Sequence, residues 1–185
     1  MSNAESWQTA EIGGPKKASV ILKPLVARAI IDHAHHPILV IGQRAAKTDI
    51  QGKKFVDFLV ELARVHSIPI IATGHVSLAL RARDCVPALI LPAVEAGQRI
   101  ADPAWNLKNG NGPCDLVIIA GLPYPMAWTL LSGLKHNAPQ VKTLNLDNTY
   151  QPNASWSFAN ISVKEWQEYL VVLVTETVPE GSADV

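Results

Sequence analysis

The sequence contains very few metal-binding side chains. Its 185 residues include two cysteines, Cys85 and Cys114, which are far apart and form no C-x-x-C pair. Two thiols are too few for a four-thiolate iron–sulfur cluster or a structural zinc site. The histidines His33, His35 and His36 end a predicted helix, but only His33 shares a helix face with a neighbour at useful separation, so they suit a solvated helix end better. We expect no metal site in this chain, and reduced cysteines in a cytoplasmic protein.

The chain also lacks net charge and long apolar runs. Sixteen basic residues balance sixteen acidic ones, so no global field would recruit nucleic acid or an anionic membrane. No segment approaches the ~18 uninterrupted apolar residues of a membrane span. The N-terminus lacks the charged start and apolar stretch of a secretory signal. We therefore expect neither nucleic acid nor membrane as a partner.

Recognisable catalytic sets are missing too. There is no G-x-S-x-G nucleophile elbow, and His75 and Ser77, two residues apart, would not face each other on a helix. The segment 42–48, GQRAAKT, resembles a phosphate-binding loop, but it lacks the second glycine and is one residue too short to encircle a phosphate. These absences predict no catalytic residue and disfavour a free-standing enzyme.

What the chain has in excess is apolar character. Its mean hydropathy is +0.14, and only 17% of its residues are charged. A monomer of this size would struggle to hide so much apolar surface, so we expect an interface with a partner and a homo-oligomer.

Apolar strands alternating with helical patterns define the predicted fold. Strands apolar on both faces, each followed by a helix, indicate a parallel sheet covered on both sides. We predict a three-layer, doubly wound, mostly parallel α/β domain over residues 19–178, with an arm at 1–18 that includes Trp7 and a tail at 179–185. The segment 86–94 could be a short strand or an apolar linker. The predicted strands are 36–42, 68–74, 115–121 and 142–148, and the predicted helices are 22–33, 55–63, 125–137 and 162–174.

The last predicted helix has the strongest signals. Ser162 and Glu165 form a capping-box pattern. The stretch 169–174 is apolar all round, which predicts burial on more than one face, with a partner subunit as one candidate cover.

Glycine follows three of the predicted strands, at Gly42, Gly74 and Gly121. Strand ends of a parallel sheet meet at one edge, where a glycine lets backbone approach a ligand closely. Two interpretations stay open: turn chemistry alone, or a cradle for the pyrophosphate of a dinucleotide. The further polar residues expected at this edge are Arg44, Thr73, His75 and Asn145.

Several short blocks, spread over most of the chain, resemble a known family. It is the epsilon subunit of the archaeal carbon monoxide dehydrogenase/acetyl-CoA decarbonylase–synthase complex. One small departure is Ala159, where other members have proline. The blocks are Trp7-Gln8-Thr9-Ala10, Gly14-Pro15-Lys16-Lys17-Ala18, Lys23-Pro24, the strand entry 36–42, Tyr150-Gln151-Pro152-Asn153-Ala154, Ser157-Phe158-Ala159-Asn160 and Glu165-Trp166-Gln167-Glu168-Tyr169-Leu170.

The resemblance implies a fold similar to the NAD/FAD-binding domain of deoxyhypusine synthase and of thiamine-diphosphate enzymes. It also implies a non-catalytic accessory subunit that stabilises a large nickel- and iron–sulfur-containing CO dehydrogenase subunit, with a suggested part in electron transfer to FAD. The cysteine count agrees, because cluster chemistry would have to lie in the partner. The alternative is a protein that binds FAD or NAD independently of that complex. Fold analogy alone does not establish a cofactor site.

Overall fold

A computed structural model describes residues 17–107 and 112–175 of the chain. Its strands are β1 (Ser19–Ile21), β2 (Pro37–Ile41), β3 (Asp49–Ile50), β4 (Lys53–Lys54), β5 (Ile70–Ala72), β6 (Leu89–Ile90), β7 (Leu116–Ala120), β8 (Lys142–Asn145) and β9 (Trp156–Phe158). Its helices are α2 (Pro24–Asp32), α3 (Arg44–Lys47), α4 (Phe55–Val65), the 3-10 turn η1 (Gly74–Val76), α5 (Ser77–Arg81), α6 (Ala93–Ala101), α7 (Tyr124–Asn137) and α8 (Val163–Val174). The predicted tail, and all but the last two residues of the predicted arm with its Trp7, lie outside the described residues.

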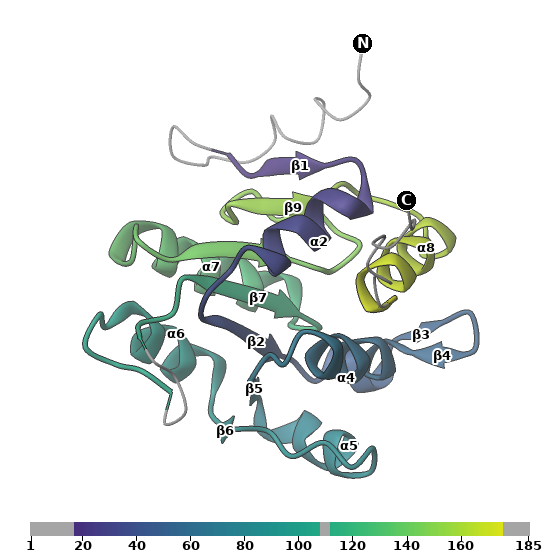
Figure 1. Cartoon of the computed structure of the whole chain (residues 1–185), viewed down its shortest axis with the longest axis horizontal. Helices are drawn as coiled ribbons and strands as arrows, with labels where there is room; N and C mark the ends of the chain where they lie inside the picture. Colours follow the sequence, from purple (N-terminus) through teal and green to yellow (C-terminus); the bar gives the residue numbers. More distant parts are fainter. Residues whose placement is uncertain (1–16, 108–111, 176–185) are drawn as a thin grey trace, which may run out of the picture.

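Seven strands form one sheet in the order β1-β9-β8-β7-β2-β5-β6 (Figure 1). Every neighbouring pair in this sheet is parallel, while β3 and β4 form a separate antiparallel pair. The predicted α/β class and parallel sheet are confirmed. So are the four predicted strands, which correspond to β2, β5, β7 and β8. The ambiguous segment 86–94 contains the short edge strand β6.

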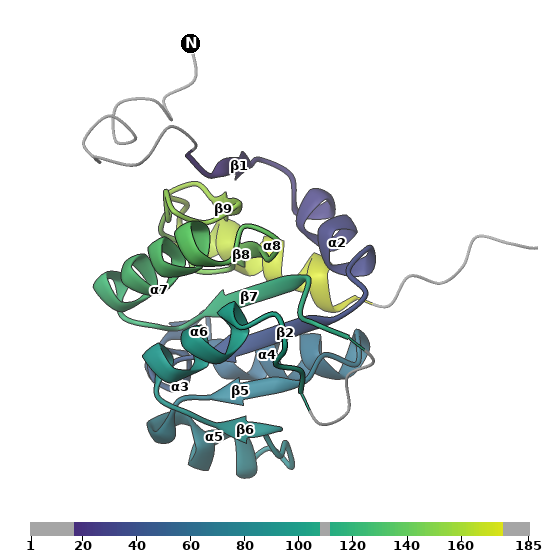
Figure 2. The ribbon, with the colours of Figure 1, turned by 90° about the vertical axis from the view of Figure 1, so that its left-hand side faces the viewer.

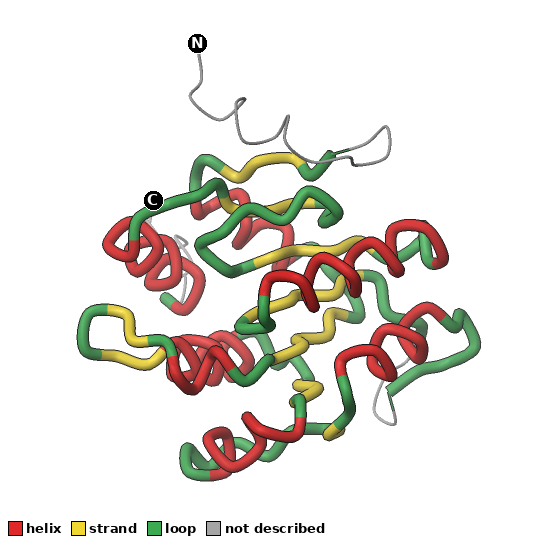
Figure 3. The backbone as a smooth tube through the Cα atoms, turned by 180° about the vertical axis from the view of Figure 1, so that it is seen from behind, coloured by secondary structure: helices red, strands yellow, loops and turns green. Residues whose placement is uncertain are grey.

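Helices cover both faces of the sheet (Figures 2 and 3). Alternate residues of a strand point to opposite faces, and β2 sends Leu39 and Ile41 into one core and Ile38 and Val40 into the other. The first core is closed by α2, α4 and α8, and the second by α6 and α7. In the described part of the chain, every helix is too short or too polar to cross a lipid bilayer.

The centre of the sheet holds its topological switch point. From β2 the chain continues to β5 and β6 on one side, then returns to build β7, β8 and β9 on the other. The turn after β2 enters α3, which packs into the first core, and the turn after β7 enters α7, which packs into the second. After these two adjacent turns the chain therefore continues on opposite faces of the sheet. Parallel sheets bind ligands at such a point.

Helix α8 begins at the predicted cap, because the Ser162 hydroxyl accepts a hydrogen bond from the Glu165 N–H at 3.2 Å. On its inner side, Leu170 and Leu173 are buried. Val171 is 45% exposed, so within the described residues one side of the helix is uncovered. Burial of that side by another chain stays a prediction.

Helix α2 packs on α8 through an arginine. Arg28 is buried, and its guanidinium donates to the carbonyl oxygen of Val172 at 3.0 Å and also to that of Thr175. The last carbonyls of a helix have no partner within the helix, so a cation here satisfies them and offsets the partial negative charge of the helix end. Ala27 and Ile31 complete the buried face of α2.

Most of the apolar stripe that predicts α2 from the sequence does not face this core, although Ile30 packs against it. Leu25 is 66% exposed, and Leu22 and Val26 are exposed as well. The helix is instead held by Arg28 and by two small or aliphatic side chains between the stripe residues. A row of large aliphatic side chains is therefore left on the surface.

Candidate functional site at the carboxyl edge of the sheet

Two of the predicted glycines touch each other at the switch point. The N–H of Gly42 donates to the Ala120 carbonyl oxygen at 2.8 Å. A Cβ atom on Gly42 would lie only 2.3 Å from the carbonyl oxygen of Gly121. Gly121 has a positive φ of 70°, and a Cβ there would lie 2.6 Å from the Ala45 nitrogen. Glycine is required at both positions because the two turns pack backbone against backbone.

A carboxylate caps the second of these turns. The Gly121 N–H donates to Oδ1 of Asp147 at 2.8 Å. Burial raises the pKa of the Asp147 carboxyl from 3.8 to about 6, although the Gly121 hydrogen bond and the charge of Arg44 act in the opposite direction. Asp147 follows β8 by two residues, so the carboxyl ends of β7 and β8 bring it to the switch point.

The space between these groups is small. Arg44, Gly121 and Asp147 share a cavity of about 30 Å³ with Tyr124, Gln151 and five further residues. That is roughly the volume of one water in the liquid, whereas sites for small organic ligands usually span about 300–1,000 Å³. In this conformation the cavity has room for ordered water but not for a small organic ligand.

Asn145 lies behind this cavity rather than in its wall. It is fully buried, and its amide nitrogen donates to the Thr149 carbonyl at 3.0 Å and to the Ser157 hydroxyl at 3.2 Å. The side-chain carbonyl oxygens of Asn145 and Gln151 are buried and accept no hydrogen bond from the described residues. Gln151 lines the cavity, so a water there could donate to its free oxygen.

The predicted residues Thr73, Gly74 and His75 lie on the other side of β2, after β5. Gly74 is exposed, and no atom lies within 4 Å of the place that a Cβ on it would occupy. It opens η1, which packs against α3. Apart from the buried Asn145, the predicted set is thus divided into two groups. Gly42, Gly121 and the neighbouring Arg44 lie at the closed switch point, and the other three residues lie in the open segment after β5.

Sequence reasoning missed Asp147, which carries the most perturbed carboxyl among the described residues. The signal was available, since a carboxylate just beyond a buried strand lies at the carboxyl edge of a parallel sheet. It was overlooked because no partner carboxylate accompanies it in the sequence.

We expect Asp147→Asn to make stability less dependent on pH. A raised carboxyl pKa means that the folded state holds the proton more tightly, so the wild type loses stability as the pH rises from about 4 to about 6. Asparagine keeps an oxygen for the Gly121 N–H but has no charge to bury. The variant should therefore gain roughly 2–3 kcal/mol at pH 8 and nothing at pH 4.

Urea unfolding at the two pH values measures this difference. The control is Glu168→Gln, which makes the same change of net charge at an exposed position of α8. An equal gain in stability for Asp147→Asn at both pH values would contradict the raised pKa of the Asp147 carboxyl.

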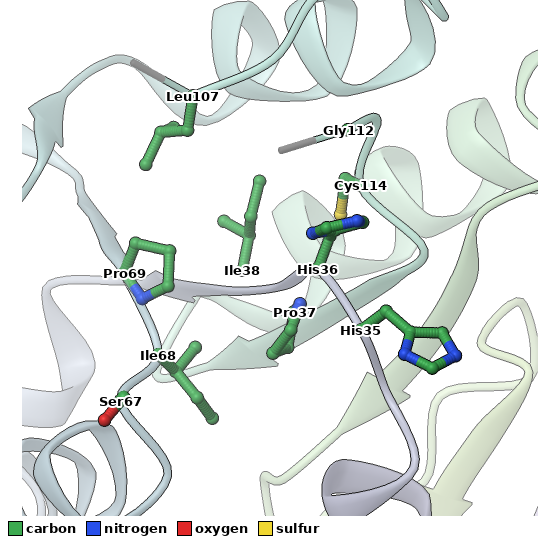
Figure 4. Close-up of a pocket in the computed structure, with 10 residues that line it drawn as sticks. All are labelled: His35, His36, Pro37, Ile38, Ser67, Ile68, Pro69, Leu107, Gly112 and Cys114. Carbon is green, nitrogen blue, oxygen red and sulfur yellow. The ribbon is translucent and has the colours of Figure 1, made fainter. Parts of the chain in front are cut away.

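A larger cavity lies at the opposite edge of the sheet, at the amino ends of β2, β5 and β7 (Figure 4). It has a volume of about 470 Å³, and His36 and Cys114 line it. Burial raises the pKa of the Cys114 thiol to about 12, and the thiol donates to the Leu116 carbonyl oxygen at 3.3 Å. A protonated thiol is not a nucleophile at neutral pH, so this pair does not form a thiol–imidazole catalytic set.

The described residues therefore define an α/β protein with a parallel sheet and a nearly closed switch point. Comparison with known proteins identifies the family of the chain. The family model of the CO dehydrogenase beta subunit/acetyl-CoA synthase epsilon subunit matches residues 2–174. The chain belongs to this family.

Named relatives extend over nearly the whole chain. The acetyl-CoA decarbonylase/synthase complex subunit epsilon of Methanothermobacter thermautotrophicus is 34% identical over 170 residues, which is 92% of this chain and 94% of that protein. Subunit epsilon 1 of Archaeoglobus fulgidus is 34% identical over 161 residues, covering 86% of this chain and 83% of the relative. Subunit epsilon 2 of Methanosarcina mazei is 33% identical over 156 residues, covering 84% and 88%.

Proposed function

We propose that this chain is a non-catalytic accessory subunit that binds and stabilises the large nickel- and iron–sulfur-containing subunit of a CO dehydrogenase/acetyl-CoA decarbonylase–synthase complex. The single observation that carries the proposal is the outward apolar face of α2, in a chain whose relatives are named as subunits of such a complex. Large exposed apolar patches in a folded protein mark interaction surfaces.

The proposed docking surface, called the α2 groove below, has both a ridge and a hollow. Leu22, Leu25 and Val26 form the exposed ridge. Beside the ridge, α2 and the amino ends of β7 and β8 enclose a hollow of about 640 Å³, with Ala29, Ile30, Leu116 and Trp156 among its lining residues. Its lining is mostly apolar, with charged or polar groups only at a few positions such as His33, Asp115 and Lys142.

A helix of the catalytic subunit suits this groove best. An amphipathic helix inserts side chains spaced at i, i+3 or i+4, and i+7 into an apolar groove and leaves its polar face in water. The resulting interface needs roughly 800 Å² on each partner for stable binding. The partially exposed side of α8, at Val171, lies on the helix against which α2 packs and offers additional apolar area.

Co-expression with the nickel–iron–sulfur subunit tests this surface. Leu25→Asp should reduce capture of that subunit by tenfold or more, because a carboxylate would have to be desolvated in an apolar contact. The fold should survive, since surface substitutions usually change stability by less than about 0.5 kcal/mol. The readout is the amount of catalytic subunit retained with the tagged chain.

The matched control is Leu78→Asp on α5, where the leucine is 76% exposed. Undiminished capture by Leu25→Asp would rule out the α2 groove as the interface. A wild-type homo-oligomer that Leu25→Asp converts to a monomer, with capture unchanged, would instead assign the groove to contacts between copies of this chain.

A dinucleotide role is the second candidate, together with the implied likeness to the deoxyhypusine synthase-type NAD/FAD-binding domain. It is favoured by the switch point and by the open position at Gly74 with Arg44 exposed nearby. It requires the turns at Gly42 and Gly121 to move apart or the ligand to lie outside them. Titration of the purified chain with FAD, followed by flavin fluorescence, tests it, and Gly74→Val is the variant that blocks approach without disturbing the packed glycines.

A further inference from the structure

A cavity of about 520 Å³ lies at the amino ends of β1, β8 and β9, across the sheet from the predicted cofactor edge. Its walls carry three lysines, Lys17, Lys135 and Lys142, and none of the described residues lining it is acidic. We propose that this cavity binds a small molecule that carries a phosphate or diphosphate group.

A buried amide in the wall gives the second, independent indication. Asn153 lines the cavity and is 4% exposed. Its side-chain amino group is buried and has no hydrogen-bond partner among the described residues. A buried donor without an acceptor is costly, and an anion in the cavity would supply the acceptor. A cluster of lysines that only faces solvent would not explain this unpaired amino group of Asn153.

The wall that carries Asn153 is held in place by parts of the chain that are far apart in sequence. The Ala18 N–H donates to the Pro152 carbonyl oxygen at 2.9 Å, and the Tyr150 hydroxyl donates to the Ala18 carbonyl oxygen at 2.9 Å. Ala18, from one of the sequence blocks that carried the family resemblance, therefore meets Tyr150 and Pro152 from another.

The strands beneath the cavity are tied together by side chains as well. The Ser155 N–H donates to the Thr143 hydroxyl at 2.8 Å, and the Thr143 N–H donates to the Ser155 hydroxyl at 3.1 Å. Both residues line the cavity. This reciprocal pair fixes the floor, so binding needs little rearrangement of the backbone.

A structural role for Lys135 alone does not account for the arrangement. Lys135 lies in the last turn of α7, where a cation offsets the partial negative charge of the helix end. That role involves neither Lys17 nor Lys142, and it leaves the amino group of Asn153 without an acceptor. Three lysines that line one cavity instead suit a ligand with several negative charges, and lysine binds phosphate as a point charge.

The size of the cavity and its other walls narrow the ligand further. A volume of about 520 Å³ exceeds what a lone phosphate would fill. Val141, Ala154 and Trp156 supply apolar surface beside the lysines. A phosphorylated organic molecule would place its charge against the lysines and its carbon skeleton against these side chains, in the manner usual for small-molecule sites.

Calorimetric titration of the full chain with pyrophosphate tests the site. Saturable binding to the wild type is expected, and Lys135→Gln and Asn153→Asp should each weaken it about tenfold or more. Asn153→Asp keeps the shape of the side chain but opposes an anion. Both positions lie outside the α2 groove, so failure here would leave the proposed docking surface unaffected.

The control is Lys164→Gln at an exposed position of α8, which makes the same change of net charge as Lys135→Gln. An equal loss of binding in Lys164→Gln would show attraction to surface charge only and would overturn the proposal. Absence of saturable binding to the wild type, or full binding by Lys135→Gln, would also overturn it. Because Lys135 is only half-buried, its variant keeps the test decisive even if Asn153→Asp does not fold.

Discussion

Gly42→Ala is expected to destabilise the protein by about 3 kcal/mol or more. The added methyl would lie 2.3 Å from the Gly121 carbonyl oxygen and 2.6 Å from the Leu122 Cα. Both of those atoms belong to the backbone, so no side chain can rotate away. The turns after β2 and β7 would have to separate, and the Gly42 N–H bond to Ala120 would be strained.

Urea unfolding measures this effect as a lower midpoint with little change in slope. Gly74→Ala is the control, since no atom lies within 4 Å of the added methyl and its φ is not in the left-handed region. It should stay within about 1 kcal/mol of the wild type. Near-wild-type stability of Gly42→Ala would show that the two turns separate readily, which is the movement a dinucleotide would require.

Leu173→Glu is the second substitution with a large expected effect, a loss of about 4 kcal/mol or more. Leu173 is fully buried on the inner side of α8, in the core shared with α2 and α4. The variant removes a packed aliphatic side chain and places a carboxylate in an apolar site without a partner. We expect most of the chain to be unfolded or aggregated at 37 °C.

Circular dichroism and size-exclusion chromatography would detect this loss. The matched control is Val171→Glu, two residues away on the same helix, where the side chain is 45% exposed. That variant should fold normally. If it also fails to capture the catalytic subunit, the outer side of α8 belongs to the interface. A folded, soluble Leu173→Glu protein would contradict the packing of α8 described here.

The sequence predicts the centre of this fold better than its margins. β2, β5, β7 and β8 are apolar on both faces, so their composition alone identifies them as buried parallel strands. β1 and β9 have three residues each and pair with each other across more than 130 positions. A local pattern contains no information about such a distant partner, and both strands were missed. Helix α6 was missed because alanine and glycine occupy most of its buried positions, so its average hydrophobicity is low although its apolar side is regular.

Helix α2 shows a different limit of sequence reasoning. Its periodicity predicts a helix correctly, yet the stripe does not say which side faces the core. Arg28 decides that, because it reaches the carbonyl oxygens at the end of α8. A buried arginine with a distant backbone partner is invisible in a hydropathy pattern.

For the candidate site, the carboxyl ends of parallel strands meet at one edge of the sheet. This rule places Gly42, Arg44 and Gly121 correctly at that edge. It does not show that the two glycines fill the crevice themselves. Close packing of backbone on backbone depends on the distance between two turns, and only the three-dimensional structure contains that distance.

The pairing of β1 with β9 has a consequence for synthesis of the chain. The first strand cannot join the sheet until its neighbour at Trp156–Phe158 has left the ribosome. At about 5–20 residues per second, that wait is on the order of ten seconds. During it, the nascent α2 lacks α8 as well, so Ala27, Arg28 and Ile31, which are buried in the folded protein, stay exposed to solvent. The N-terminal strand and helix therefore stay unpacked until most of the chain has been synthesised.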